Sequence, residues 1–291
     1  MAKKYLSAFA QPQLEQIIDQ MIAAALAEDL NTIDHGTDIT AELIPGEKIS
    51  NAQLIAKEAG VLCGQAWFEG CFKALDTDID IQWLKEDSQS FVSGDIIAEI
   101  SGNARAILTA ERSGMNFIQT LSGTATLTSE YVTKLEGTSC RLLDTRKTVP
   151  GLRLAQKYAV RCGGGNNHRI GLYDAYLIKE NHIRACGGIN QAISQARINH
   201  PGLPVEVEVE NLEELKVAIE SGADTVMLDN FPNEMKTQAV AINDGKIPLE
   251  ASGDINLDTI SDVAKTGVDF ISVGAVTKHV RAIDFSLLII E

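Results

Sequence analysis

The residues best suited to chemistry gather in one stretch of this 291-residue chain, residues 141–184. This stretch contains nine Lys or Arg residues and three acidic residues. Its formal charge is therefore +6, whereas the whole chain has a net charge of −15. A basic island in an acidic protein indicates a local anion site, although a solvated charged face is the commoner meaning of a charge run. Thr145, Arg146 and Lys147 follow one apolar run, and Lys179 ends another, where α/β folds place their sites. We predict a small ligand with several negative charges.

A second set of charges alternates with valine over residues 205–210. In a strand this alternation puts Glu206, Glu208 and Glu210 on one face. That face either meets water, as at a sheet edge, or turns into a parallel barrel whose helices cover the valines. Glu208 and Asp229 would then end neighbouring strands, and their oxygens suit the hard ion Mg²⁺. We predict a carboxylate pair that coordinates or orients a hydrated Mg²⁺.

Small residues follow the last two apolar runs: Ser252-Gly253-Asp254 and, after Val273, Gly274-Ala275. In serial β/α folds the final two loops often bind phosphate through backbone N–H groups. Each pair alone is equally consistent with a tight turn. Their occurrence together at these positions predicts a phosphate site.

Two further cations leave alternatives open. Lys179 could form a Schiff base or act as a fixed charge. The neighbouring arginines favour the fixed charge, because arginine binds carboxylate and phosphate but forms no imine. Arg112 lies beside Glu111 in a helical pattern, where a surface ion pair of little energetic value is the simpler interpretation.

The elements that must position these residues fall into two patterns. The first predicts an α+β sandwich, with an amphipathic helix over residues 13–30, short strand-like runs between residues 39 and 108, and a helix near residues 65–74. Residues 101–103 are interpreted as a turn. Two separate helices are expected next, over residues 104–121 and 124–135.

After Gly137 strand-like and helical runs alternate. The polar strand ends from Glu208 to Gly274 recur at steps of 21, 23 and 22 residues, the length of one β/α unit. We predict an incomplete parallel α/β barrel of six to seven strands, with a doubly wound open sheet as the rival. The expected domains are residues 1–116 (sandwich) and 117–278 (barrel with the site at the strand ends), the tail 279–291 joining the sandwich.

Composition excludes several classes of protein. The isoelectric point near 4.8 argues against a nucleic-acid-binding surface, and no apolar run is long enough to span a bilayer. Five widely spaced cysteines are typical of free thiols in a reducing compartment. We therefore expect a cytoplasmic protein with no nucleic-acid or membrane partner.

Several long motifs also resemble a known family. DTRKTVPGLRLAQKYAVRCGGGNNHRIGLYDAYLIKENHI is similar to the signature of the quinolinate phosphoribosyltransferases, and the similarity extends to NARAILTAERSGMNFIQTLSGTAT, VEVEVENLEEL and ASGDINLDTI. The resemblance covers nearly the whole chain. It implies an N-terminal sandwich, an incomplete α/β barrel and a homodimer. It also implies a Mg²⁺-dependent reaction that joins quinolinate to 5-phosphoribosyl-1-diphosphate, releases diphosphate and CO₂, and forms nicotinate mononucleotide for NAD synthesis.

The resemblance assigns roles by motif. Quinolinate-binding cations are implied at Arg146, His168, Arg169 and Lys179, with Lys147 serving either substrate. Glu208 and Asp229 would hold the ribose and the Mg²⁺-diphosphate, and Lys147, Lys179, Glu208 and Asp229 would be the catalytic set. Thr145 would join the substrate contacts, and Ser252, Gly253, Asp254, Val273, Gly274 and Ala275 would line the 5′-phosphate site. Arg112 would reach the site of the partner subunit, which reverses its interpretation from pattern alone.

Two departures from the family pattern are visible: Asp254 stands where glycine or asparagine is expected, and the chain ends in the apolar run Leu287–Ile290. Two other functions stay open. A paralogous phosphoribosyltransferase could act on another aromatic acid, or a binding protein could retain the scaffold without activity. Neither alternative explains why every charged strand-end residue is present.

Overall fold

The chain folds into two compact units, each built around its own sheet. A computed structural model describes residues 11–31 and 37–290. One unit comprises the described residues up to Leu127, together with Leu154–Gly164 and the segment from His279 onward. The other comprises Thr128–Arg153 and Gly165–Lys278. Within the described residues, no helix has the length and apolar character needed to cross a membrane.

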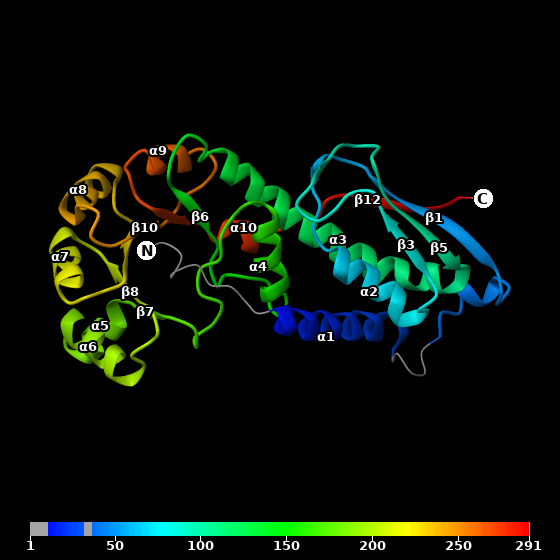
Figure 1. Cartoon of the computed structure of the whole chain (residues 1–291), viewed down its shortest axis with the longest axis horizontal. Coiled ribbons are helices and arrows are strands. Elements are labelled where there is room, and N and C mark those ends of the chain that lie inside the picture. Colours follow the sequence, from blue (N-terminus) through cyan, green and yellow to red (C-terminus); the bar gives the residue numbers. More distant parts are fainter. Residues whose placement is uncertain (1–10, 32–36, 291) are drawn as a thin grey trace. The chain divides into compact units, whose positions relative to one another are not determined.

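The first unit is an antiparallel sheet covered on one face by helices (Figure 1). Its four strands lie in the order β12 (Phe285–Ile290), β1 (Ile49–Ala56), β5 (Ile96–Asn103) and β3 (Asp80–Trp83). The covering helices are α1 (Gln11–Leu30), α2 (Gln65–Leu75) and α3 (Ala104–Thr133). Shorter elements complete it: η2 (Ala41–Leu43), the paired strands β2 (Gly60–Val61) and β4 (Ser90–Phe91), and α4 (Arg153–Cys162).

Apolar side chains from both layers form the core of this unit. Leu26 of α1, Phe68 of α2 and Ile107 of α3 are fully buried against Leu54 and Ile97 of the sheet. The amphipathic pattern predicted for residues 13–30 is therefore present as α1. The C-terminal apolar run forms β12, whose residue Phe285 pairs with Ala56.

Two local predictions in this unit are wrong, both because of glycine. The two helices expected over residues 104–135 are one helix, α3, and the Cβ of an alanine at Gly123 would stand 2.1 Å from the Arg281 carbonyl oxygen. That glycine permits a close approach of backbone and does not end the helix. Gly102 lies inside β5 and not in a turn, where a Cβ would stand 2.7 Å from Ile79 Cγ1.

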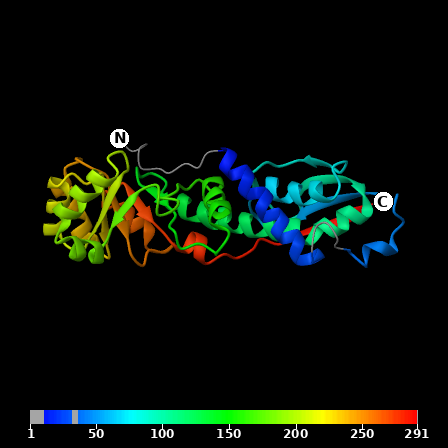
Figure 2. The ribbon, with the colours of Figure 1, turned by 90° about the horizontal axis from the view of Figure 1, so that it is seen from below.

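The second unit is a parallel sheet of six strands, within the predicted range of six to seven. The order is β6 (Arg141–Leu143), β11 (Phe270–Ser272), β10 (Leu249–Ser252), β9 (Thr225–Asp229), β8 (Val205–Val209) and β7 (Tyr176–Ile178). The helices are α5 (Glu180–Cys186), α6 (Ile189–Asn199), α7 (Leu212–Glu220), α8 (Asn233–Asn243), α9 (Ile260–Ala264) and α10 (Ala275–Lys278). Figures 1 and 2 show α5 to α8 along the outer side of the strands.

The valine–glutamate alternation explains how β8 is oriented. Val205, Val207 and Val209 are fully buried, as a strand covered by helices requires. Glu206 and Glu208 consequently project to the opposite, inner side. Glu210 comes after the end of the strand and is exposed, so only two of the three glutamates face the interior.

The unit boundary lies further along the chain than residues 116–117. It falls within α3, after Leu127, and most of α4 belongs to the antiparallel unit although it is flanked by segments of the parallel one. Helix α3 is continuous through this point, so no change of secondary structure marks the boundary in the sequence.

Candidate active site

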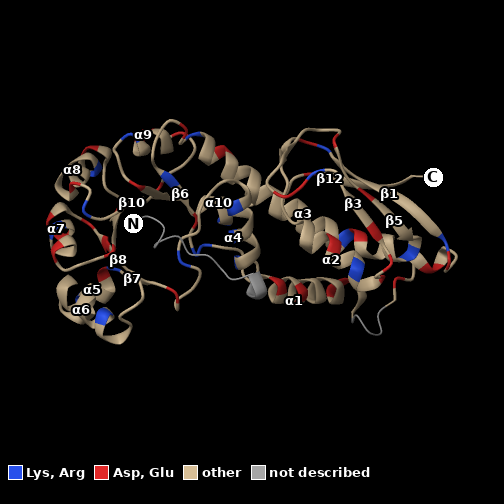
Figure 3. Ribbon diagram, in the orientation of Figure 1, with Lys and Arg blue, Asp and Glu red and all other residues tan. Residues whose placement is uncertain are grey.

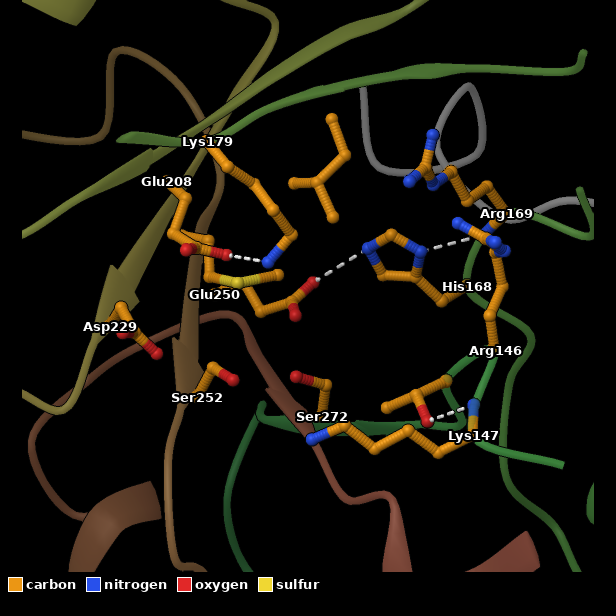
Figure 4. Close-up of a pocket in the computed structure, with 13 residues that line it drawn as sticks. Arg146, Lys147, His168, Arg169, Lys179, Glu208, Asp229, Glu250, Ser252 and Ser272 are labelled. Atoms are coloured by element: carbon orange, nitrogen blue, oxygen red, sulfur yellow. Dashed lines mark hydrogen bonds and ion pairs between the residues drawn. The ribbon is translucent and has the colours of Figure 1, made fainter. Parts of the chain in front are cut away.

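Residues at the carboxyl ends of the parallel strands line a cavity of about 280 Å³ (Figure 4). Nine of the predicted residues line it: Thr145, Arg146, Lys147, His168, Arg169, Lys179, Glu208, Asp229 and Ser252. The remaining lining residues are Leu177, Met227, Glu250 and Ser272. In Figure 4 Arg146 and Arg169 lie on one side of the cavity, and Glu208 and Asp229 lie on the other.

The basic side is suited to an anion. The Nε atoms of Arg146 and Arg169 are buried and have no hydrogen-bond partner within the described residues. Burial, and then the charge of Arg146, lower the pKa of Arg169 below its ordinary value. Like charges held this close are costly unless an anion compensates them. Figure 3 shows the contrast with α1, which carries acidic residues and no lysine or arginine.

The opposite side is formed by carboxylates at the ends of β8 and β9. Lys179 Nζ donates to Glu208 Oε2, and we call these two residues the rim pair. The Lys179 side chain is 44% exposed, whereas that of Glu208 is 11% exposed. Asp229 accepts from Asn230 Nδ2 at 2.9 Å. The lysine already has a carboxylate partner, as expected for a fixed charge and not for an imine-forming amine.

A second charged group lies deeper, and we call His168, Glu206 and Glu250 the buried cluster. His168 Nε2 lies 2.8 Å from Glu206 Oε2 and 3.5 Å from Glu250 Oε2. Burial, followed by the charge of Glu206, raises the pKa of Glu250 to about 8. Glu250 therefore retains its proton at neutral pH, and the two carboxyl groups carry one negative charge between them.

Both ring nitrogens of His168 have a partner. The backbone N–H of Arg169, the next residue in the chain, donates to His168 Nδ1 at 2.8 Å. Nε2 lies 2.8 Å from Glu206 Oε2. These two contacts fix the orientation of the ring, which lines the cavity beside the two arginines.

A buried aspartate positions the segment that carries His168. Asp144 follows β6 and accepts from the backbone N–H of His168 at 2.8 Å and from Asn167 Nδ2 at 2.7 Å. Asp144 is fully buried. The DTR motif thus joins two parts of the basic stretch, with Arg146 entering the cavity while Asp144 lies behind it.

Of the predicted phosphate loops, Ser252 lines the cavity, whereas Gly253, Asp254 and Gly274 are not among the lining residues. Gly253 has φ +104°, and a Cβ there would stand 2.0 Å from Asn230 Oδ1. Asp254 has φ 35° and is exposed, so this departure from the family pattern occupies a left-handed position that aspartate tolerates. At Gly274 a Cβ would stand 3.0 Å from Lys147 Cδ, so glycine lets the lysine pass close to the loop.

The other predicted contacts lie elsewhere. Val273 is buried and donates its N–H to the Leu143 carbonyl, and Ala275 begins α10. Arg112 is exposed on α3 and belongs to the antiparallel unit. The residues predicted from the sequence did not include Glu250 and Ser272. A single glutamate within the apolar run PLEAS was a signal that could have identified Glu250.

The site also offers oxygen ligands for a divalent ion. Glu208 and Asp229 supply carboxylates from adjacent strands, a donor set that fits Mg²⁺ when substrate oxygens and water complete it. Among the described residues, the buried cluster also has ligand atoms within 4.8 Å of one another.

Two domain families of the same enzyme match most of this chain. Residues 38–122 match the N-terminal domain of quinolinate phosphoribosyl transferase, and residues 124–288 match its C-terminal domain. The probable carboxylating nicotinate-nucleotide pyrophosphorylase of Bacillus subtilis is 43% identical over 257 residues, which are 87% of this chain and 89% of that protein. The corresponding chloroplastic protein of Arabidopsis thaliana is 40% identical over 289 residues, covering 92% and 82%.

Solved structures agree with these matches. The nicotinate-nucleotide pyrophosphorylase of Francisella tularensis superposes with a TM-score of 0.91 at 52% identity, over 94% of this chain and 96% of that one. NadC of Streptococcus pyogenes gives a TM-score of 0.90 at 39% identity, over 98% and 100%. The similarity therefore covers both units.

Proposed function

The chain belongs to the quinolinate phosphoribosyltransferase family, and on that premise we propose how its cavity performs the family's reaction. The reaction joins the ring nitrogen of quinolinate to 5-phosphoribosyl-1-diphosphate, releases diphosphate and CO₂, and yields nicotinate mononucleotide for NAD biosynthesis. The chain is thus a decarboxylating pentosyltransferase. The observation that supports this most directly is the pair of buried, unpartnered guanidinium Nε groups facing two carboxylates.

Quinolinate binds on the basic side. Its two carboxylates pair with Arg146 and Arg169, whose planar guanidinium groups can bind a carboxylate through two parallel hydrogen bonds. Arg169 Nη1 donates to the Ala175 carbonyl at 3.0 Å, which holds the guanidinium group at the wall of the cavity. His168 also lines the cavity, where its Nε2 contacts Glu206.

The ribosyl diphosphate lies toward the carboxylate side. Positive charge develops on the sugar carbon as diphosphate leaves, and Glu208 or Asp229 stabilises it electrostatically. Lys147 and Lys179 compensate the phosphate charge. Mg²⁺, held by Glu208 and Asp229, would neutralise the departing diphosphate. The loops at Ser252–Gly253 and Gly274 adjoin the 5′-phosphate.

Decarboxylation needs no additional electron acceptor. Once the ring nitrogen carries the ribosyl group it is positively charged, and it stabilises the electron pair that stays on the neighbouring ring carbon as CO₂ departs. A proton from water then takes the place of the lost carboxylate. The protein supplies position and charge compensation. A cavity lined by arginines binds the departing carboxylate before the reaction, and the ring remains in place through its second carboxylate.

One assay tests the function. Purified protein is given quinolinate and 5-phosphoribosyl-1-diphosphate with and without Mg²⁺, and diphosphate and CO₂ are measured together. We expect equimolar release that depends on the metal ion. Nicotinate, which lacks one carboxylate, should react with a kcat/KM lower by a factor on the order of 10³ or more, because an unpaired buried arginine remains. Comparable turnover of both acids would rule out the proposed binding mode.

We also propose a homodimer in which Arg112 completes the partner's site. The support is that Arg112 is exposed, outside the cavity of its own chain, and within a motif that matches the family. Arg112→Ala and Lys179→Ala should each be nearly inactive. Mixing them under subunit exchange creates one site with both changes and one with neither, so activity should return. No recovery after exchange has been verified by mass would exclude the shared site.

A cytoplasmic location is the last part of the proposal. Its support is that all five cysteines are free, as a reducing compartment maintains them. Fractionation of cells producing the tagged chain should place it with cytoplasmic markers, and enrichment in a membrane or secreted fraction would contradict this.

A further inference from the structure

Two thiols of the antiparallel unit, neither of which lines the cavity, lie close to one another. Cys63 lies between β2 and α2, and Cys162 is the last residue of α4. Their sulfur atoms and an Asp87 carboxylate oxygen all lie within 4.8 Å of one another. Both cysteines belong to one apolar cluster that also contains Trp67 and Leu121. The proposed reaction uses neither thiol.

The surroundings favour a dithiol over a metal site. Asp87 Oδ1 accepts from the backbone N–H groups of Gly64 and Gln65 at 3.0 and 3.3 Å. Asp87 Oδ2 accepts from the Tyr158 hydroxyl at 2.8 Å. The carboxylate is thus fully engaged in joining α4 to the start of α2. Only the two sulfurs remain, which is fewer ligands than a structural zinc site requires.

Independent contacts hold the two cysteines in this position. The Cys63 N–H donates to Ser122 Oγ at 3.0 Å, and Ser122 Oγ donates to the Cys63 carbonyl at 3.2 Å. Tyr158, one turn before Cys162 in α4, is fixed by its bond to Asp87. These hydrogen bonds involve no sulfur atom. They therefore hold the two cysteines in position whatever the oxidation state of the sulfurs.

We propose that Cys63 and Cys162 are a redox-active dithiol, which a hydroperoxide oxidises to a disulfide that lowers turnover. Cys162 attacks first, because it is 9% exposed whereas Cys63 has no exposed surface. Its sulfur forms a bond to a peroxide oxygen as the O–O bond breaks, and water leaves. The Cys63 sulfur then displaces the hydroxyl from the Cys162 sulfenic acid, again as water. Two thiols lose two electrons, and one hydrogen peroxide becomes two waters.

Electrostatics supports this division of roles. A hydrogen bond from the Cys63 thiol lowers the pKa of Cys162 below its ordinary value, and burial raises that of Cys63. The thiolate is the nucleophile in attack on peroxide. Cys162 is therefore the better attacking group, and Cys63 is the better resolving group.

The chain leaving α4 connects the dithiol to the cavity. Gly163 N–H donates to the Ala159 carbonyl and Gly164 N–H donates to the Arg161 carbonyl, both at 3.0 Å. These bonds fix the direction in which the chain leaves the last turn of α4. His168 follows Cys162 by six residues. Drawing Cys162 toward Cys63 therefore changes the direction of the segment that carries His168. Misplacement of site residues by about 1 Å lowers rates by up to about 10²-fold.

The test treats the purified full-length protein with hydrogen peroxide. Free thiols are then alkylated under denaturing conditions, and the digest is searched by mass spectrometry for a peptide linked through Cys63 and Cys162. We expect that peptide together with a loss of turnover on the order of tenfold that dithiothreitol reverses. Cys63→Ala and Cys162→Ala should each abolish the linked peptide and keep their activity in peroxide.

Matched controls separate this site from the other thiols. Cys140→Ala removes a buried thiol and Cys186→Ala an exposed one, and both variants should still be inactivated reversibly. The linked peptide is a chemical readout, so it tests the dithiol even if quinolinate proves not to be the substrate. Absence of the linked peptide, or a linked protein with unchanged turnover, would overturn the proposal. If one alanine variant fails to fold, the other still decides the result.

Discussion

Two glutamates on β8 show how the same residue type takes different roles two positions apart. Glu208 lines the cavity, and its partner in the rim pair, Lys179, is 44% exposed. Glu206 instead contacts His168 and Glu250 of the buried cluster, whose side chains are only 11% and 1% exposed. A charge with an exposed partner can exchange that partner for a substrate, whereas a buried charge cannot do so without a large desolvation cost. We infer that the rim pair serves chemistry and the buried cluster serves geometry.

The largest expected effect comes from breaking the rim pair. Glu208→Gln keeps the shape of the side chain and removes its charge, so kcat should fall by about 10² to 10³-fold with little change in the free energy of unfolding. Steady-state kinetics and urea unfolding measure the two effects. Glu210→Gln, beyond the end of the strand and exposed, is the matched control and should behave as the parent protein. Near-normal kcat in Glu208→Gln would remove it from the mechanism.

The next effect comes from breaking the buried cluster. Glu206→Ala leaves His168 Nε2 without its 2.8 Å acceptor and should lower the free energy of unfolding by about 3 kcal/mol. Glu206→Gln retains an acceptor oxygen and should cost less. Urea unfolding measures both. If Glu206→Ala were as stable as the parent protein but as slow as Glu208→Gln, the division between geometry and chemistry would be wrong.

A third effect separates the two regions by pH. Glu250 releases its proton near 4.5, its ordinary value, in the unfolded chain, but near 8 in the folded protein. Between these values the folded state binds more protons, so the free energy of unfolding falls as pH rises from about 4.5 to 8. Glu250→Gln resembles the protonated form and should reduce this slope by up to about 1.4 kcal/mol per pH unit. Urea unfolding across this range measures it.

The control for that experiment is Glu234→Gln on α8, an exposed position where the slope should not change. An unchanged slope in Glu250→Gln would mean that Glu250 is ionised in the folded protein.

The smallest effect sharpens the description of the rim. Gly274→Ala introduces a Cβ 3.0 Å from Lys147 Cδ, a flexible side chain that can shift by a few tenths of an ångström. KM for 5-phosphoribosyl-1-diphosphate should rise roughly threefold, with kcat nearly unchanged. Quinolinate affinity should stay the same. A larger effect on quinolinate than on the diphosphate substrate would show that Lys147 belongs to the other half of the cavity.

The residues that lie together at the ends of the parallel strands could be predicted from the sequence. Arg146, Lys179 and Asp229 were expected at one edge of a sheet because parallel strands end on the same side, and they do line one cavity. The inward turn of Glu206 and Glu208 followed from the valines between them. The roles assigned to these residues remain predictions, as does Mg²⁺.

Contacts between residues far apart in the sequence could not be predicted from the local sequence pattern. The pKa of Glu250 is raised by burial and then by the charge of Glu206, which is far away in sequence. Glycine at position 123 of α3 accommodates the Arg281 carbonyl, which is also distant in sequence. None of these contacts leaves a periodic signal in composition or spacing.

The pairing of β12 with β1 has a consequence for how the chain is made. Ala56 leaves the ribosome early, but its partner Phe285 is synthesised only after every strand of the parallel sheet. At about 5 to 20 residues per second the β1 edge waits for roughly ten seconds to a minute. During that interval its open backbone groups can pair with any other extended segment nearby. The nascent protein thus passes through a period in which a chaperone that shields strand edges would improve its yield.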